Sequence, residues 1–262
     1  MQKKRYYYIL AIRYLGFRYH GWQNQPNVIT VEGMFRKTIR YVLNDREAKV
    51  LASGRTDAKV SANKTYIELF TYEPIKNIEV FLGTFNFNLP SDIRILEISE
   101  TDESFNIIQS PKLKTYHYYF AFGEKFHPFC ASLMCHLHGT LDIELMQKAA
   151  GLFEGEKDFF SYTFQPKENT ITVSKIDHCS IELNTKMTAS FFPERSYVMI
   201  VKGEGFKRNQ IRLMMGALID LGRSKTSLDE FKRTLDGKNK IVLEHIATGS
   251  GLILEDVLIF DK

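Results

Sequence analysis

An acidic and a basic side chain stand two positions apart in residues 52–58, whose sequence is Ala-Ser-Gly-Arg-Thr-Asp-Ala. Small neighbours let a ligand or another stretch of backbone approach closely. A carboxylate beside a guanidinium stays ionised, so Asp57 next to Arg55 has the chemistry of a nucleophile or a proton acceptor. The same residues also suit a surface turn, in which Asp57 accepts hydrogen bonds from backbone amides and pairs with Arg55. Taken alone, the pattern favours the turn.

Other patterns that carry chemistry are weaker. Cys130, Cys135, His136 and His138 are close in sequence, but their spacing fits a zinc site poorly, and we expect no bound metal. Gly203-Glu-Gly205 lacks the third glycine of a dinucleotide-binding turn, and no phosphate-binding P-loop occurs, so we expect no nucleotide cofactor. Three cysteines are too few for a secreted disulfide framework, which predicts a cytoplasmic protein. No apolar run reaches the ~18–20 residues of a membrane span, so we expect no membrane partner.

Positive charge is concentrated in parts of the chain. The 262 residues carry 35 Lys and Arg against 31 Asp and Glu, a formal net charge of +4. Residues 1–40 hold eight basic side chains and one acidic side chain, a net +7. A second cluster contains Lys202, Lys207, Arg208 and Arg212, with Glu204 as the acidic neighbour. Such clusters suit a polyanion such as nucleic acid, although a solvated basic face that keeps the protein soluble fits them as well.

The hydrophobic pattern indicates a mixed α+β protein. Alternation predicts strands over Tyr6–Tyr14, Thr65–Tyr72, Ile93–Ile98, Thr115–Phe122, Thr172–Leu183 and Ser196–Lys202. Helical spacing predicts helices over Val31–Leu43 with Thr30 as its cap, Ile75–Leu82 with Pro74 in its first turn, Ile143–Phe153, Asn209–Leu221 and Ser227–Leu235. Loops are predicted over Gly16–Ile29 and Ser53–Asn63. The order predicts antiparallel or mixed sheets with helices packed on one face, in an N-terminal lobe of residues 1–125 and a C-terminal lobe of residues 126–262.

Motifs along nearly the whole chain carry a family resemblance. Besides residues 52–58, they are Gly21–Pro26, Thr30–Gly33, Asn86–Ile93, Lys114–Tyr118, Glu156–Phe159, Gly205–Arg212, Gly216–Leu218 and Gly251–Leu254. In this order they resemble the motifs of the TruA family of tRNA-modifying pseudouridine synthases, and the chain is similar to a divergent member. The resemblance implies two RRM-like, or ferredoxin-like, lobes around a central RNA-binding cleft. It also implies a homodimer that binds tRNA and isomerises uridine to pseudouridine without a cofactor.

The resemblance also implies a role for individual residues. Asp57 matches the catalytic carboxylate, which attacks C1′ of the ribose, adds to C6 of the base or removes the C2′ proton; the sequence leaves these three open. Tyr116 matches the tyrosine that stacks on the target base, and Arg212 the arginine that pairs with the catalytic Asp. Leu252 would pack against the base. Arg55 would occupy the space left when the uridine is flipped out of the RNA.

Four further side chains are candidates for contacts with the RNA backbone, and four positions depart from the family pattern. The candidates are Arg18, Lys59, Lys207 and Arg208. The departures are Lys59 in place of Gly, Ser61 in place of His, Ile108 in place of Arg and Lys114 in place of Arg. They leave open whether this chain acts on uridines 38–40 of the tRNA anticodon arm, which is the family's usual target.

Three alternative functions remain at this stage. The chain could be a noncatalytic RNA-binding relative, or a pseudouridine synthase with a different RNA target. It could also be a nucleoside or glycoside hydrolase that uses Asp57, although such enzymes typically need a second carboxylate as general acid and the sequence places none beside Asp57.

Overall fold

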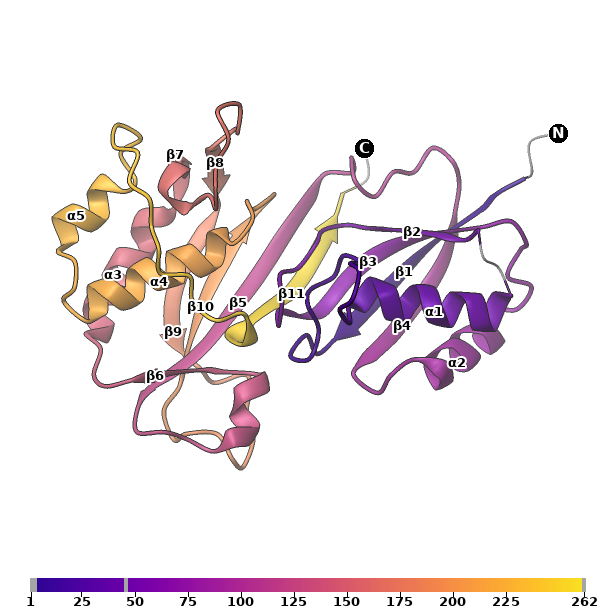
Figure 1. The fold of residues 1–262 in the computed structure, drawn as a ribbon, viewed down its shortest axis with the longest axis horizontal. Coiled ribbons are helices and arrows are strands. Elements are labelled where there is room, and N and C mark those ends of the chain that lie inside the picture. The colour runs from indigo at the N-terminus through magenta and orange to yellow at the C-terminus, as the bar shows by residue number, and fades with distance from the viewer. Residues whose placement is uncertain (1–3, 45–46, 261–262) are drawn as a thin grey trace. The chain divides into compact units, whose positions relative to one another are not determined.

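The computed structural model describes residues 4–44 and 47–260, and the chain divides into two compact units. Unit 1 comprises Met1–Lys112 and Leu254–Lys262, and unit 2 comprises Leu113–Ile253. Each unit combines strands with helices (Figure 1), which confirms the α+β class. The last strand thus belongs mainly with the N-terminal segment. The two lobes with the bounds 1–125 and 126–262 stay a prediction.

Unit 1 is built around strand β1. Its strands are β1 (Tyr6–Tyr14), β2 (Lys49–Ala52), β3 (Ser61–Thr71), β4 (Ile93–Thr101) and most of β11 (Leu252–Ile259). They lie in the order β4-β1-β3-β11, with β2 also paired to β3. Strand β1 runs antiparallel to both neighbours, with Tyr8 opposite Leu69 of β3 and opposite Glu100 of β4. Because β1 is central, the loop that follows it starts from a well-anchored position.

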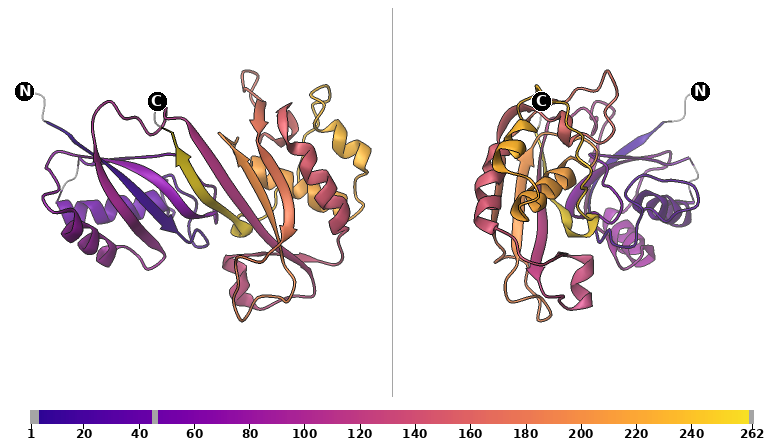
Figure 2. Two further views of the ribbon diagram at one scale, coloured as in Figure 1. Left: turned by 180° about the vertical axis from the view of Figure 1, so that it is seen from behind. Right: turned by 60° about the vertical axis from the view of Figure 1, so that its left-hand side comes forward.

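The helices of unit 1 cover one face of its strands (Figures 1 and 2). They are α1 (Val31–Leu43) and α2 (Ile78–Asn88). Their aromatic side chains meet in the core, where the ring centroids of Phe35 and Phe85 are 5.7 Å apart and those of Trp22 and Phe35 are 6.1 Å apart. These rings are buried, and burial of large aromatic groups is a dominant source of stability in such layers. Trp22 also fixes residues just before α1 to the core.

The caps decide where these helices begin. Thr30 accepts a hydrogen bond from the Gly33 amide at 3.2 Å, which confirms the expected start of α1. The expected start of α2 was wrong, because Pro74 lies before the helix. The side chain of Asn77 accepts from the Val80 amide at 3.0 Å, so the helix begins after Asn77. An asparagine side chain satisfies an amide that has no partner within the helix, whereas Pro74 only fixes φ.

Unit 2 contains a mixed sheet and a small hairpin. In the sheet, β5 (Lys112–Gly123), β10 (Tyr197–Gly203) and β9 (His178–Leu183) pair antiparallel, and β6 (Cys135–His138) pairs parallel to β5. The hairpin consists of β7 (Gly155–Asp158) and β8 (Val173–Ile176). The helices are α3 (Ile143–Ala150), α4 (Gln210–Gly222) and α5 (Leu228–Arg233). Helices α3 and α4 pack against each other, and α3 packs on β9 (Figures 1 and 2).

Short elements account for the other differences from the expected pattern. Residues Thr172–Leu183 form two strands in different sheets, separated at Asp177, whose amide donates to the Lys202 carbonyl at 2.8 Å. The predicted helix Ile143–Phe153 is α-helical to Ala150 and then tightens into a 3-10 turn over Gly151–Phe153. The four-residue strands β2, β6 and β7 were not predicted. Alternation over four residues is too short to distinguish a strand from a loop.

A buried carboxylate in β3 gives a stability prediction. The Glu68 side chain is 1% exposed, and its Oε2 accepts from the Ile107 amide at 3.1 Å. Among the described residues, its Oε1 has no hydrogen-bond partner. Burial raises the pKa of this carboxyl, partly offset by the bond from Ile107. The charged form therefore costs stability that neutral glutamine would not.

We expect Glu68→Gln to raise the free energy of unfolding at pH 7–8 by about 1 kcal/mol. Because the folded pKa is raised, the cost of Glu68 appears as pH rises through that value. It is absent below the unfolded pKa of roughly 4.3, where both states are protonated. Urea unfolding at several pH values would check this. A difference between variant and wild type that does not change with pH would contradict it.

Candidate active site

The loop that carries Asp57, residues 53–60, is held from three sides. The Ser53 amide donates to the Tyr66 carbonyl at 2.9 Å, and the Trp22 amide donates to the Thr56 carbonyl at 3.1 Å. The Thr56 Oγ1 and the Tyr14 hydroxyl are hydrogen-bonded at 2.8 Å in the core. Burial raises the pKa of Tyr14, so this tyrosine stays neutral. The residue immediately before Asp57 is therefore fixed by both its backbone and its side chain.

Gly21 lets the loop after β1 approach this segment. The loop comprises residues 16–29 and is called here the N-terminal loop; its Gly21 has φ +89°. A Cβ atom at this position would lie 2.6 Å from the Thr56 carbonyl oxygen. Both the positive φ and the short distance require glycine. The Trp22–Thr56 hydrogen bond depends on this close approach.

Charged side chains flank Asp57 on its own loop. Asp57 is half-buried, whereas Arg55 and Lys59 are exposed to solvent. The Asp57 carbonyl accepts from the Val60 amide at 3.2 Å, so residues 57–60 form a tight turn. The structure thus places Asp57 in a tight turn, with a basic residue two positions before it and another two positions after it. A half-buried carboxylate on a fixed loop has the chemistry of a nucleophile or a base.

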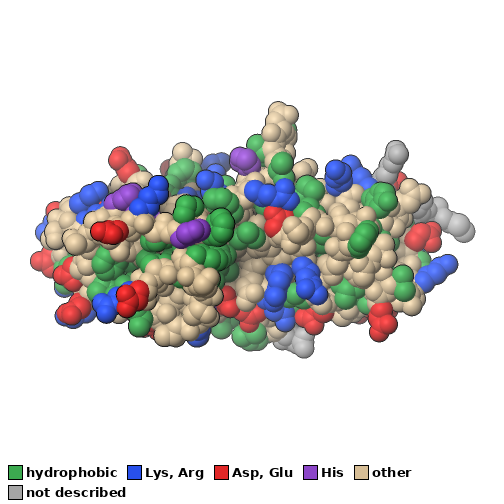
Figure 3. Space-filling model, turned by 90° about the horizontal axis from the view of Figure 1, so that it is seen from below, with side chains coloured by type: hydrophobic (Ala, Val, Ile, Leu, Met, Phe, Trp, Pro, Cys, Tyr) green, Lys and Arg blue, Asp and Glu red, His purple; other side chains and the backbone are tan. Residues whose placement is uncertain are grey.

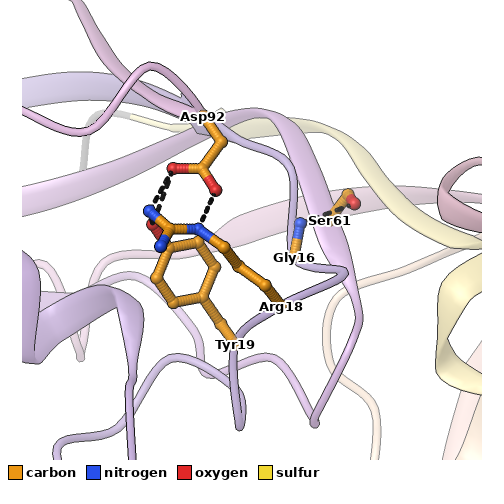
Figure 4. Close-up of polar contacts among 5 residues, drawn as sticks. All are labelled: Gly16, Arg18, Tyr19, Ser61 and Asp92. Atoms are coloured by element: carbon orange, nitrogen blue, oxygen red, sulfur yellow. Dashed lines mark hydrogen bonds and ion pairs between the residues drawn. The ribbon is translucent and has the colours of Figure 1, made fainter.

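Arg18 belongs to a polar cluster that anchors the N-terminal loop (Figure 4). Its guanidinium donates to both oxygens of Asp92, through Nε to Oδ2 and through a terminal nitrogen to Oδ1 at 3.0 Å. The Tyr19 hydroxyl also donates to Asp92 Oδ1, at 2.7 Å. Burial alone would raise the pKa of Asp92, but the bonds from Arg18 and Tyr19 and the Arg18 charge outweigh it and lower the pKa. The carboxylate therefore stays ionised and ties the loop to the start of β4.

Sequence reasoning missed this anchoring role. Arg18 was a candidate for the RNA backbone, and that role stays a proposal beside the observed ion pair. Asp92 lies in the motif Asn86–Ile93, but 74 residues separate it from Arg18. No local pattern indicates such a pairing. A bidentate arginine–carboxylate pair is nevertheless one of the stronger polar contacts that a partly exposed site can form.

In unit 2, Tyr116 lies on β5 and is buried, with 8% of its surface exposed. Its ring meets the ring of Phe206 edge-on, with centroids 5.3 Å apart. Tyr118 and Tyr119 are also buried, as expected for core tyrosines. The Tyr118 hydroxyl donates to the Thr248 carbonyl at 2.8 Å, and burial raises its pKa well above the usual value.

Arg212 projects from the first turn of α4 and is held in place. Its Nε donates to the Ala247 carbonyl at 2.7 Å, and a terminal nitrogen donates to Asn209 Oδ1 at 2.8 Å. One turn further along α4, a Cβ on Gly216 would lie 1.8 Å from the His245 carbonyl oxygen. Residues 245–248 therefore run directly along α4. The guanidinium is therefore oriented by the Ala247 carbonyl and the Asn209 side chain.

Leu252 follows this same segment at the start of β11 and is buried. A Cβ on Gly251 would lie 2.6 Å from the Tyr119 carbonyl oxygen, so the chain also passes tightly against β5. Residues 245–252 thus contact α4 on one side and β5 on the other. Unit 2 thereby brings Arg212 and Leu252 to the same connecting segment, beside the strand of Tyr116.

The basic residues that precede α4 are accessible. Arg208 is exposed, with its guanidinium carbon 5.1 Å from the centroid of the Phe164 ring, and Lys207 is half-buried. Figure 3 shows Lys and Arg side chains on one face of the protein in small groups among acidic, apolar and neutral side chains. On that face they do not form one continuous basic surface. Each group would therefore add a separate, local attraction for phosphate.

The cysteines and histidines do not assemble a metal site in the described residues 4–44 and 47–260, where no group of three or more His, Cys, Asp and Glu side chains is placed to hold an ion. The cysteines are buried, and Cys130 Sγ donates to the Phe191 carbonyl at 3.2 Å. Within the same residues, no helix has the length and apolarity needed to cross a membrane.

Comparison with known proteins identifies the family. The sequence model of the family described as tRNA pseudouridine synthase matches residues 149–258. The tRNA pseudouridine synthase A of Pelobacter propionicus is 31% identical over 95% of this chain and 97% of its own length. The enzyme of the same name from Geotalea uraniireducens gives the same values, and that of Thermodesulfovibrio yellowstonii is 29% identical over 95% of this chain and 98% of its own length. The chain therefore belongs to the tRNA pseudouridine synthase family of isomerases.

Proposed function

We propose that this protein isomerises uridine to pseudouridine in tRNA. The observation that carries the proposal is family membership over 95% of the chain, combined with an Arg55-Thr56-Asp57 loop that is fixed by Tyr14 and Trp22. A fixed and accessible carboxylate is what such a reaction needs from its protein.

The reaction is an internal rearrangement. The bond from C1′ of the ribose to N1 of uracil breaks, the base turns, and a new bond forms between C1′ and C5. The hydrogen on C5 leaves as a proton, and N1 gains one. Electrons balance without an oxidant or reductant, so the proposal includes no cofactor. Asp57 acts by attack at C1′, by addition to C6, or by removal of the C2′ proton, and each route requires an ionised carboxylate at a fixed position.

Residues of unit 2 bind the target base in this proposal. Tyr116 stacks on the uracil, Leu252 packs against it, and Arg212 pairs with the catalytic carboxylate. Uridine in folded RNA must first be flipped out, at a cost of a few kcal/mol. Arg55, which is exposed, fills the vacated space. Stacking on an aromatic ring returns about 1–3 kcal/mol per base, which is enough to offset most of this cost.

The finer points of the proposal concern the target and the assembly. We include uridines 38–40 of the anticodon arm as the target, two RRM-like lobes with an RNA-binding cleft, a homodimer and a cytoplasmic location. The departures at Lys59, Ile108 and Lys114 affect residues that would contact RNA, whereas Ser61 is buried and accepts a hydrogen bond from the Gly16 amide. All four leave Asp57, Tyr116 and Arg212 unchanged. They therefore bear on which uridine is chosen more than on the chemistry.

The RNA contacts predict a steep dependence of binding on salt. Arg18, Lys59, Lys207 and Arg208 are the proposed phosphate contacts, and each releases about 0.7–0.9 of a counterion. A plot of log K for tRNA binding against log salt should have a slope of about −3. Fluorescence anisotropy between 50 and 200 mM salt would measure it. A flat plot would contradict the RNA assignment.

The experiment that tests the function maps pseudouridine in tRNA. Unmodified cellular tRNA is incubated with the protein, and pseudouridines are located by carbodiimide block of reverse transcription. We expect new stops in the anticodon arm at positions 38–40. Stops elsewhere would support a synthase with another target and overturn the proposed site. Binding without any stop would indicate a noncatalytic relative, and release of free uracil would indicate a hydrolase.

A further inference from the structure

Lys59 adopts a backbone conformation that its residue type disfavours. Its φ is +66°, in the left-handed region where a Cβ atom crowds the following carbonyl. The side chain is exposed, and its Nζ lies 5.8 Å from the centroid of the Phe17 ring. This distance is at the outer limit of a cation–π interaction, so it adds little stability. This weak contact of the Lys59 side chain does not offset the backbone strain, which points to a functional role for that side chain.

Phe17 is unusual for a different reason. It lies at the tip of a turn, where the Tyr19 amide donates to the Gly16 carbonyl at 2.8 Å, and 39% of its surface is exposed. Turn tips usually carry small or polar residues that solvent can hydrate. An aromatic ring at such a tip leaves an apolar surface facing solvent. Its neighbour Lys59 places a positive charge beside that surface.

The backbone that carries both residues is rigid. The Gly16 amide donates to Ser61 Oγ at 2.9 Å, and a Cβ on Gly16 would lie 2.0 Å from the Val60 carbonyl oxygen (Figure 4). The Lys59 amide donates to the Tyr19 carbonyl at 3.0 Å. The Arg18–Asp92 pair fixes the same turn from the other side. The backbone of Phe17 and of Lys59 is therefore held at a fixed position, which reduces the entropy lost on binding.

We propose that Phe17 and Lys59 together form a subsite for a single-stranded nucleotide next to the target uridine, with the base stacked on the Phe17 ring and the phosphate bound by Lys59. Aromatic rings beside basic groups are the usual means of binding unpaired RNA. Lys59 follows Asp57 by two residues, which span at most about 7 Å. The bound nucleotide is therefore a near neighbour of the one that reacts. This inference rests on the proposed function and adds a residue, Phe17, that stacks on the nucleotide beside the target uridine.

The first test measures tRNA binding and turnover by Phe17→Leu and Lys59→Gln. Leucine keeps the apolar surface but cannot stack, so KM and the dissociation constant for tRNA should rise about 10-fold, within the range expected for one stacked base. Lys59→Gln should make the slope of log K against log salt shallower by about 0.7–0.9, the value of one phosphate contact. The matched controls are Phe87→Leu in α2 and Lys76→Gln shortly before α2, both exposed positions in the same unit, and they should change neither quantity.

The second test uses Lys59→Gly, which separates binding from a structural role. Glycine relieves the left-handed backbone, so the melting temperature should rise by about 2–4 °C. Loss of the ammonium group should at the same time weaken tRNA binding several-fold. A residue kept for the fold alone would change stability and leave the salt slope unchanged.

Failure of the proposed subsite and failure of the proposed function would give different results. If wild-type protein forms pseudouridine but the Phe17 and Lys59 variants match their controls in KM and salt slope, the subsite is wrong and the proposed function stands. If wild-type protein binds tRNA without forming pseudouridine, the proposed function fails, and the subsite is judged by the dissociation constants alone. Equal tRNA affinity of wild type and Phe17→Leu would overturn the subsite in either case.

Discussion

Replacing Asp57 by asparagine is expected to abolish pseudouridine formation while tRNA binding stays within about twofold of wild type. Asparagine has nearly the same shape, and the turn is held through the Asp57 carbonyl and the Val60 amide, which the substitution leaves in place. An amide neither attacks C1′ or C6 nor removes the C2′ proton at a useful rate. Loss of a group of this kind typically costs about 10⁴-fold or more in turnover.

The control for Asp57→Asn is Asp102→Asn, an exposed turn position in unit 1 whose carboxylate accepts from the Ser104 amide at 2.8 Å. This variant removes one negative charge from the same unit without touching the loop of residues 53–60. Its turnover should equal that of wild type. Circular dichroism should show both variants folded. Full activity of Asp57→Asn would show that Asp57 is not the catalytic carboxylate.

Replacing Gly216 by alanine should have the largest effect on stability. The new Cβ would lie 1.8 Å from the His245 carbonyl oxygen, and backbone yields less readily than a flexible side chain. Helix α4 and residues 245–248 must separate, which also displaces the Ala247 carbonyl that orients Arg212. We expect a loss of about 2–4 kcal/mol in the free energy of unfolding, together with reduced kcat/KM.

Gly83→Ala is the matched control, because Gly83 also lies inside a helix. A Cβ at this position would meet no atom within 4 Å. Alanine is the better helix former, so this variant should gain about 0.5–1 kcal/mol. Urea unfolding of both variants would measure the difference. Equal stability of Gly216→Ala and wild type would mean that residues 245–248 yield easily, and would contradict the fixed position of Arg212.

The local parts of the fold were predictable from local chemistry. Helix α1 begins and ends where the Thr30 cap and the apolar spacing place it, and β1 matches its alternating segment. The start of α2 was misplaced because Pro74 and Asn77 are both plausible helix starters. Only the observed Asn77–Val80 hydrogen bond distinguishes them. The four-residue strands β2 and β6 each pair with a longer strand, which no periodicity reveals.

In the candidate site, too, the local features were predictable from the sequence and the long-range contacts were not. The loop at Asp57 was visible as a cluster of small residues around an Arg and an Asp. The residues that hold this loop in place could not be identified from the sequence, because Tyr14 and Trp22 look like ordinary core residues there. The positive φ of Lys59 and the Arg18–Asp92 pair depend on residues that come together only in the folded chain. The sequence suggests candidate reacting groups, and the packing determines how they are held.

One measurement tests the central claim most directly. Pseudouridine formation replaces the hydrogen on C5, so tRNA labelled with tritium at C5 of uridine releases tritium to water as it reacts. With enzyme in excess, wild-type protein should release one equivalent of tritium for each target uridine, and Asp57→Asn should release none above the protein-free control. Equal release by both proteins, or no release by wild type that binds the labelled tRNA, would contradict the account.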